Sequence, residues 1–230
     1  KNIIVIQSES FFDPRHDFKF IKKEVLSHFD DIKKESTHSG RLHVPAWGAN
    51  TVRTECGFLT GLPAKNMGIH QFNPYRFLVD HKIPNLVAYL KERGYITICI
   101  HPYPASFYHR DKVFPKLGFD QFIDIADFGP QQKAGQYIAD LAVSNKINTL
   151  LDEQESKPLF IFAITMENHG PLHLEKPKSS AVESFYTQPA PNNSADLTVY
   201  LQHLQNADLM IKDLKQGMQK ISKQSLLCWY

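Results

Sequence analysis

The chain has 230 residues, 42% of them hydrophobic, which is enough to bury one substantial core. Its 26 basic and 24 acidic residues give a formal net charge of +2, and no basic run or stripe stands out, which excludes a nucleic-acid-binding surface. The 3 cysteines lie far apart, which excludes a disulfide framework and a cysteine zinc site. The sequence contains no run of 18 apolar residues, so no membrane span is predicted within it.

Apolar runs and helical periodicities alternate along the first two thirds of the chain. The β-branched run 2–6 is typical of a strand buried on both faces of a parallel sheet. A helix is predicted over 84–93, with Pro84 in its first turn and Gly94 as its stop. A strand over 95–100, a helix over 135–151 and a third buried strand over 158–165 follow.

The last third holds the clearest helical pattern. Apolar residues recur at three- and four-residue steps over 195–220, and a fourth strand is predicted over 226–230. Residues 171–193 are rich in proline and serine and predict a long loop. The alternation predicts one α/β domain with a mostly parallel central sheet and helices on both faces.

Acid and imidazole side chains follow three of the predicted strands. Glu9 comes after the first strand, His101 after the second and His169 after the third. In open α/β sheets the chemistry gathers at the carboxyl ends of the strands, so we expect these three side chains to share one site.

A second candidate is the segment 48–63. Gly48, Asn50 and Thr51 predict a turn into a helix, with Asn50 or Thr51 as the N-cap and Glu55 early in the helix. One interpretation is simply a capped helix start. The other is that the positive end of the helix supports a hydroxyl that, held against a metal ion, attacks phosphorus.

Four ordered motifs together resemble the lipoteichoic acid synthases and the periplasmic-glucan phosphoglycerol transferases of the alkaline-phosphatase/sulfatase superfamily. The first is the strand ending in the Glu-Ser pair at Glu9, and the second is a threonine, Thr51, four positions before a glutamate. The third is His101 with an aromatic residue seven positions on and an arginine nine on, before Gly118-Phe119-Asp120. The fourth is Asn168-His169-Gly170-Pro171, which is similar to the family's Asn-His-x-Pro.

The resemblance implies a role for each matching residue. Glu9 is expected to bind a divalent metal, most simply Mn²⁺ with Mg²⁺ or Zn²⁺ as alternatives, and Thr51 to be both metal ligand and nucleophile. The substrate-binding residues implied are His101, Tyr108, Arg110 and His169. Arginine supplies planar donors that match phosphate oxygens.

Each of these residues also has a plain structural interpretation. Arg110 could be a surface arginine paired with Asp111 or Asp120. His101, before a proline, could be a capped turn residue, and His169 could be an ordinary loop residue.

The sequence departs from the family pattern in two places. The family completes its metal site with an Asp-His pair after a late strand, which here corresponds to 226–230, where the sequence ends. We therefore expect residues 1–230 to be an incomplete, C-terminally truncated catalytic domain. The Cys/Ser-x-Pro-x-Arg motif of sulfatases proper is missing, since Cys56 is followed by Gly57-Phe58-Leu59, and this argues against sulfate ester hydrolysis.

The resemblance implies a transferase that moves phosphoglycerol from a phospholipid head group to a glycan or polymer acceptor through a phospho-threonine intermediate. It also implies transmembrane segments outside this chain and a domain on the extracytoplasmic side of the membrane. A phosphoethanolamine transferase, a phosphodiesterase or sulfatase-like hydrolase, and a non-catalytic domain that binds head groups or glycans remain the alternatives.

Overall fold

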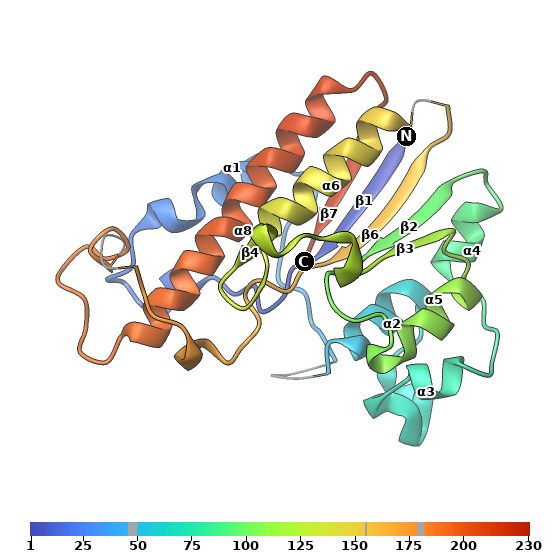
Figure 1. The fold of residues 1–230 in the computed structure, drawn as a ribbon, viewed down its shortest axis with the longest axis horizontal. Coiled ribbons are helices and arrows are strands. Elements are labelled where there is room, and N and C mark those ends of the chain that lie inside the picture. Colours follow the sequence, from blue (N-terminus) through green and yellow to red (C-terminus); the bar gives the residue numbers. More distant parts are fainter. Residues whose placement is uncertain (46–49, 155, 179–181) are drawn as a thin grey trace.

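The computed structural model describes residues 1–45, 50–154, 156–178 and 182–230. A five-stranded sheet runs through it in the order β3-β2-β6-β1-β7, and all four strand pairings are parallel. Its strands are β1 (Asn2–Gln7), β2 (Ile96–Ile100), β3 (Gln121–Ile123), β6 (Leu159–Ile164) and β7 (Ser225–Trp229). The order places β1 and β6 in the middle of the sheet, and the two neighbouring strands β2 and β7 beside them (Figure 1).

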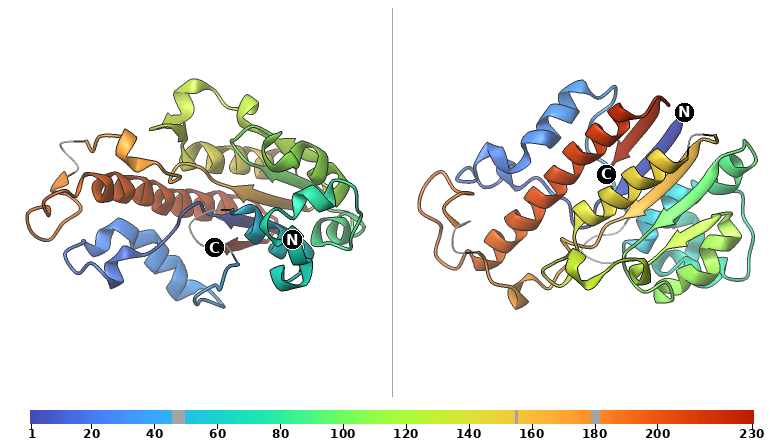
Figure 2. Two further views of the ribbon diagram at one scale, coloured as in Figure 1. Left: turned by 90° about the horizontal axis from the view of Figure 1, so that it is seen from below. Right: turned by 45° about the horizontal axis from the view of Figure 1, so that its top comes forward.

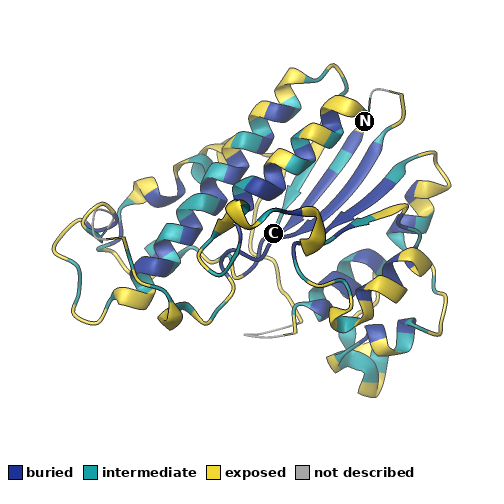
Figure 3. Ribbon diagram, viewed as in Figure 1, coloured by how far each residue is buried: buried dark blue, intermediate teal, exposed yellow. Residues whose placement is uncertain are grey.

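The central strands are the most deeply buried part of the molecule (Figure 3). Every residue of β6 is buried, which explains why its sequence is a continuous apolar run rather than an alternating one. Register pairs Ile4 with Ile161 and Val5 with Phe162 across the β1–β6 boundary. Because successive side chains point to opposite faces, these pairs contribute alternately to the two cores on either side of the sheet.

Helices cover both faces of this sheet (Figures 1 and 2). On one face α6 (Asp140–Glu153) and α8 (Ala195–Lys220) pack against each other and against the strands. The other face is covered by shorter helices, namely α2 (Val52–Thr60), α3 (Tyr75–Leu78), α4 (Leu86–Lys91) and α5 (Arg110–Leu117). The predicted fold class, a mostly parallel sheet with helices on both faces, is therefore confirmed.

Helix α8 extends beyond the sheet and supports a third apolar cluster. Its first half packs against α1 (Ser27–Glu35) and the short 3-10 helix η2 (Lys23–Leu26), with Phe185 and Tyr186 completing the cluster. The other short 3-10 helices are η1 (Pro14–His16), η3 (Ala64–Phe72), η4 (Phe107–His109), η5 (Ile125–Asp127), η6 (Pro130–Gln132) and η7 (Leu172–Leu174).

Two predicted helices begin later than expected. The helix predicted over 135–151 starts at Asp140, because residues 133–138 form a two-stranded hairpin of β4 (Lys133–Ala134) and β5 (Tyr137–Ile138). Gly135, with φ of 68°, adopts the left-handed conformation that the two-residue hairpin turn requires. Similarly, Pro84 lies before α4 rather than in its first turn, since Asn85 is the N-cap and accepts the Ala88 N–H. Across the described residues, no helix is long and apolar enough to cross a bilayer.

We expect Phe160→Ala to lower the free energy of unfolding by about 3–5 kcal/mol, because the substitution leaves a cavity in the centre of the sheet's core. The side chain of Phe160 is fully buried. The matched control is Ile69→Ala, whose side chain is 84% exposed, and it should change the value by less than about 0.5 kcal/mol. Urea unfolding followed by circular dichroism measures both, and equal effects would contradict the assigned core.

Candidate active site

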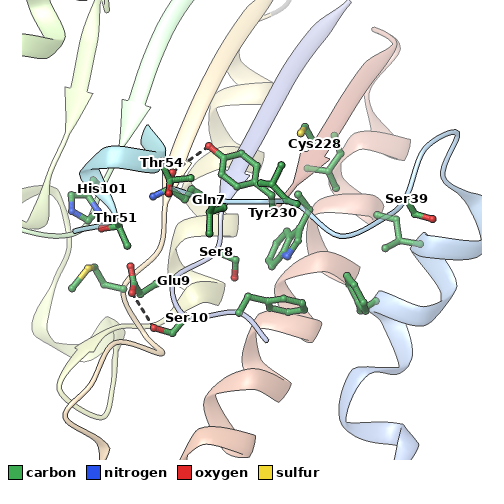
Figure 4. Close-up of a pocket in the computed structure, with 18 of the residues that line it drawn as sticks. Gln7, Ser8, Glu9, Ser10, Ser39, Thr51, Thr54, His101, Cys228 and Tyr230 are labelled. Atoms are coloured by element: carbon green, nitrogen blue, oxygen red, sulfur yellow. Dashed lines mark hydrogen bonds between the residues drawn. The ribbon is translucent and has the colours of Figure 1, made fainter. Parts of the chain in front are cut away.

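A cavity of about 1600 Å³ opens at the carboxyl ends of the strands (Figure 4). The residues that the sequence singled out all line it: Glu9, Thr51, His101, Tyr108, Arg110 and His169. They come from the segments after β1, β2 and β6, and from the start of α2 and of α5. The structure thus places all six predicted residues at one cavity, and Glu9, His101 and His169 reach it from strand ends, as the strand-end rule requires.

Glu9 is held rigidly at the end of β1. Its backbone N–H donates to Thr165 Oγ1 at 3.0 Å, and Ser10 Oγ donates to its Oε1 at 3.0 Å. The side chain is nearly buried, and burial raises the pKa of Glu9 above its ordinary value, opposed by nearby His169 and by the Ser10 hydrogen bond. Within the described part of the chain its Oε2 accepts no hydrogen bond, so this oxygen can bind a cation.

Thr51 occupies the N-cap position of α2 but does not cap the helix. Its backbone is helical, and its carbonyl accepts the N–H groups of Thr54 and Glu55 at 2.9 and 3.0 Å. Its hydroxyl has no hydrogen-bond partner among the described residues and lines the cavity. The predicted capping role is therefore wrong, and the hydroxyl is left for a ligand. Gly48 of the predicted turn lies outside the described residues.

His101 is a neutral imidazole with a defined tautomer. It is 2% exposed, and its Nδ1 lies 3.1 Å from the Ile164 carbonyl oxygen, so Nδ1 carries the proton. Burial, and then the charge of Arg110, lower its pKa well below the ordinary value. The interpretation of His101 as a capped turn residue is wrong, because its ring is buried against the end of β6. Its Nε2 remains an acceptor.

Arg110 is buried and forms an ion pair with Glu55 on α2. Its Nε donates to Glu55 Oε2 at 3.0 Å, its Nη2 donates to Oε1, and Tyr75 Oη donates to Oε2 at 3.3 Å. The surface pairing with Asp111 or Asp120 is thus wrong; Asp120 pairs with Lys91 instead. Glu55 occupies only one edge of the guanidinium, so N–H groups on Nη1 and Nη2 remain for a phosphate.

Tyr108 closes a ring of contacts around the nucleophile candidate. Its hydroxyl donates to Asn50 Oδ1 at 3.2 Å, and the Arg110 guanidinium lies 5.2 Å from the centre of its ring. Asn50, Tyr108 and His109 all have left-handed backbones, with φ of 61°, 57° and 60°. Such conformations cost energy in residues other than glycine, and they cluster at functional sites.

His169 is the most exposed of the predicted residues. Its Nδ1 donates to the carbonyl oxygen of Gly170 at 2.6 Å, and its ring meets the ring of Tyr137 at a centroid distance of 5.5 Å. It therefore is a loop residue, as one interpretation held, but one whose ring is positioned at the cavity. Its Nε2 is free of hydrogen bonds within the described ranges.

Sequence reasoning missed a buried polar group behind this site. Glu167, Asp140 and His203 are all buried, and His203 contacts both Glu167 and Glu175. The sequence did offer one sign of this group, because Glu167 follows the same predicted strand as His169, but only His169 was chosen as the site residue. Tyr200, also on α8, was missed too; its hydroxyl lies 2.9 Å from the Ser10 carbonyl oxygen and accepts the Phe12 N–H at 3.0 Å.

The residues present fit one part of a divalent-metal site. Glu9 and Thr51 offer two oxygen atoms with free lone pairs at one cavity, and oxygen ligands suit Mn²⁺ and Mg²⁺. In the ranges that the structure describes, no group of three or more His, Cys, Asp or Glu side chains could hold a metal ion. Glu9 and Thr51 thus fit as two of the ligands of a divalent metal ion, which needs further ligands besides them.

The sulfatase family model matches residues 1–230. The chain belongs to the sulfatase family. A relative of this sulfatase-family chain, the putative cyclic beta-1,2-glucan modification protein of Rhizobium meliloti (strain 1021), is 26% identical over 226 residues, which are 98% of this chain and 34% of the relative. The chain therefore spans about a third of that relative's length.

Two solved structures share the fold of this sulfatase-family chain. Streptococcus pyogenes phosphoglycerol transferase GacH, in complex with sn-glycerol-1-phosphate, has a TM-score of 0.80 at 24% identity and covers 100% of this chain and 60% of its own. The lipoteichoic acid synthase LtaP of Listeria monocytogenes has a TM-score of 0.79 at 22% identity, covering 100% and 55%. The resemblance predicted from the four motifs is confirmed.

We expect Glu55→Gln to destabilise the fold by about 3–5 kcal/mol, because it leaves the Arg110 guanidinium buried without its counter-charge. Glu92→Gln, at an exposed position on the end of α4, is the control and should stay within about 0.5 kcal/mol of wild type. Chemical denaturation measures both. A loss below about 1 kcal/mol for Glu55→Gln would show that water or another group screens Arg110.

The neutral state of His101 predicts how stability depends on pH. Because its folded pKa lies below 6.5, the unfolded chain gains a proton that the folded chain cannot hold as the pH falls below 6.5. The free energy of unfolding should therefore drop by up to about 1.4 kcal/mol per pH unit relative to His101→Gln. Denaturation of both proteins between pH 5 and pH 8 measures it; parallel curves would contradict it.

Proposed function

We propose that this protein is a metal-dependent transferase that moves a phosphoglycerol-type group from a phospholipid head group to a glycan or polymer acceptor. The observation that carries the proposal is the Thr51 hydroxyl, which makes no capping hydrogen bond to α2 and lines the same cavity as Glu9 and the free edge of Arg110. A hydroxyl nucleophile, an oxygen ligand for a cation and a phosphate-matching guanidinium are the parts that phosphoryl transfer needs.

In the first half-reaction Thr51 Oγ attacks phosphorus of the donor phosphodiester. The Oγ–P bond forms as Thr51 gives up its hydroxyl proton, the bond between phosphorus and the diacylglycerol oxygen breaks, and that oxygen leaves and takes up a proton. A divalent cation held by Glu9 and Thr51, Mn²⁺ or alternatively Mg²⁺ or Zn²⁺, would lower the pKa of the Thr51 hydroxyl and neutralise charge on the phosphoryl oxygens. The position of Thr51 at the positive end of α2 acts in the same direction.

The other residues bind the charge and shape of the transferred group. Arg110 presents its free N–H groups to the phosphoryl oxygens, and Glu55 prevents the guanidinium from rotating away. His101 and His169 offer ring nitrogens that bind the phosphate or glycerol oxygens, and Tyr108 forms an aromatic wall. In the second half-reaction an acceptor hydroxyl attacks phosphorus and loses its proton, the Oγ–P bond breaks, and Thr51 Oγ takes up a proton, which regenerates the hydroxyl.

The comparisons support the chemistry in general terms. GacH is named a phosphoglycerol transferase and was solved with sn-glycerol-1-phosphate, and LtaP is named a lipoteichoic acid synthase. The name of the Rhizobium relative supports a glycan acceptor. With a phospholipid donor, the domain acts at the outer surface of the cytoplasmic membrane, held there by segments outside this chain, and residues 1–230 are one part of the catalytic domain.

Intact-mass analysis of the gene's full-length protein, incubated with Mn²⁺ and phosphatidylglycerol, tests the proposal. We expect a glycerophosphate adduct on the wild type and none on Thr51→Ala, whose turnover should fall by at least about 10³-fold because the nucleophile is gone. Thr54→Ala, which lines the same cavity one helical turn away, is the matched control and should keep the adduct.

Other outcomes would replace the proposal. An adduct from phosphatidylethanolamine alone would identify a phosphoethanolamine transferase, and release of glycerophosphate to water without an acceptor would identify a phosphodiesterase. Absence of adduct, hydrolysis and metal binding in the full-length protein would leave a domain that binds head groups or glycans.

A further inference from the structure

His203 of α8 lies buried between two carboxylates from other parts of the chain. Its Nδ1 is 2.9 Å from Glu167 Oε1, and its Nε2 is 3.0 Å from Glu175 Oε2. His203 is 4% exposed and Glu167 is fully buried, so neither is solvated. Both ring nitrogens are therefore used in charged hydrogen bonds at the same time.

This geometry fixes the protonation state of the ring. A neutral imidazole has one N–H donor, whereas two carboxylates need two, so His203 is an imidazolium. Burial alone would lower its pKa, but the hydrogen bond and charge of Glu167, together with those of Glu175, outweigh burial and raise it.

Each carboxylate also accepts a hydrogen bond from at least one other donor. Glu167 Oε1 also accepts from Asn206 Nδ2, and its Oε2 accepts the Asp140 N–H at 2.7 Å. Glu175 Oε1 accepts the Gln136 N–H at 3.2 Å. Asp140 is another buried titratable group here, and burial and then the nearby Glu167 charge raise its pKa well above the ordinary value, which favours the neutral acid.

The two carboxylates bracket the loop that carries His169. Glu167 precedes His169 by two positions and Glu175 follows it by six, so His203 closes residues 167–175 into a loop fixed at both ends. Within this loop His169, Gly170 and Pro171 line the cavity.

We propose that His203 is a positioning residue, which clamps both ends of the loop 167–175 and thereby holds His169 at the cavity. In so far as His169 binds the donor phosphate, the proposal rests on the proposed function. Whether His203 holds the two ends of the loop does not depend on what His169 binds.

The pH dependence of the clamp has a definite direction. The folded pKa of His203 is raised, so its stabilisation of the loop is fully present below pH 6.5 and is lost as the pH rises through that raised value. Above it, a neutral ring retains one of the two contacts and the loop opens at one end.

Hydrogen exchange followed by mass spectrometry tests the clamp in the full-length protein. We expect protection factors of amides in 168–175 to fall by about tenfold or more in His203→Gln, which cannot serve two carboxylates with charged donors. His173→Gln removes an exposed histidine from the same loop and should leave protection unchanged. In the wild type, protection of this loop should decline at alkaline pH while β6 stays protected.

Glu175→Gln provides the second variant should His203→Gln fail to fold. It keeps a side chain of the same size but removes one charge, so the alkaline loss of loop protection should move to lower pH. A purely structural role for Glu175 would lower protection at every pH without that shift. Unchanged loop protection in both variants, or a midpoint that does not move in Glu175→Gln, would overturn the proposal.

Kinetics connect the clamp to the reaction. If the transferase activity is present, both variants should raise KM for the phospholipid donor by about tenfold while kcat changes less, and His173→Gln should do neither. A protein with no transferase activity would refute the proposed function, yet hydrogen exchange would still decide on the clamp. An unaltered KM together with a released loop would show that His203 does not position His169 for the donor.

Discussion

The site depends above all on the buried ion pair between Glu55 and Arg110. It joins the helix that begins at the nucleophile candidate, Thr51, to the helix that supplies the phosphate-binding candidate, and it does so where water cannot compete. Tyr108 completes the ring through Asn50, the residue before Thr51. The distance between hydroxyl and guanidinium is thus set by contacts inside the protein before any substrate arrives, which is the preorganisation that transition-state stabilisation requires.

Much of this could be predicted from the sequence because it depends on patterns that are local. The continuous apolar runs identified β1, β2, β6 and β7, and the three- and four-residue period of α8 identified that helix with its observed bounds. The parallel sheet then placed Glu9, His101 and His169 at one edge, since parallel strands end on the same side. The family resemblance added Thr51, Tyr108 and Arg110, and all six line one cavity.

What could not be predicted depends on contacts between distant parts of the chain. No local sequence feature marks Glu55, rather than Asp111 or Asp120, as the partner of Arg110, and both aspartates are nearer in sequence. The pairing is decided by which carboxylate the fold buries against the guanidinium. The same holds for His203, whose two partners lie 36 and 28 positions away. The hairpin before α6 was missed because helix-compatible residues surround Gly135, and a tertiary contact with Glu175 fixes the turn there.

Helix α8 carries a mechanical consequence. Tyr200 and His203 lie three positions apart on it, and one holds the loop after β1 while the other holds the loop after β6. With 26 residues, α8 is a stiff rod about 39 Å long. The loops that carry Glu9 and His169 are therefore anchored about one helical turn apart on the same stiff element, so their relative position depends on where α8 lies.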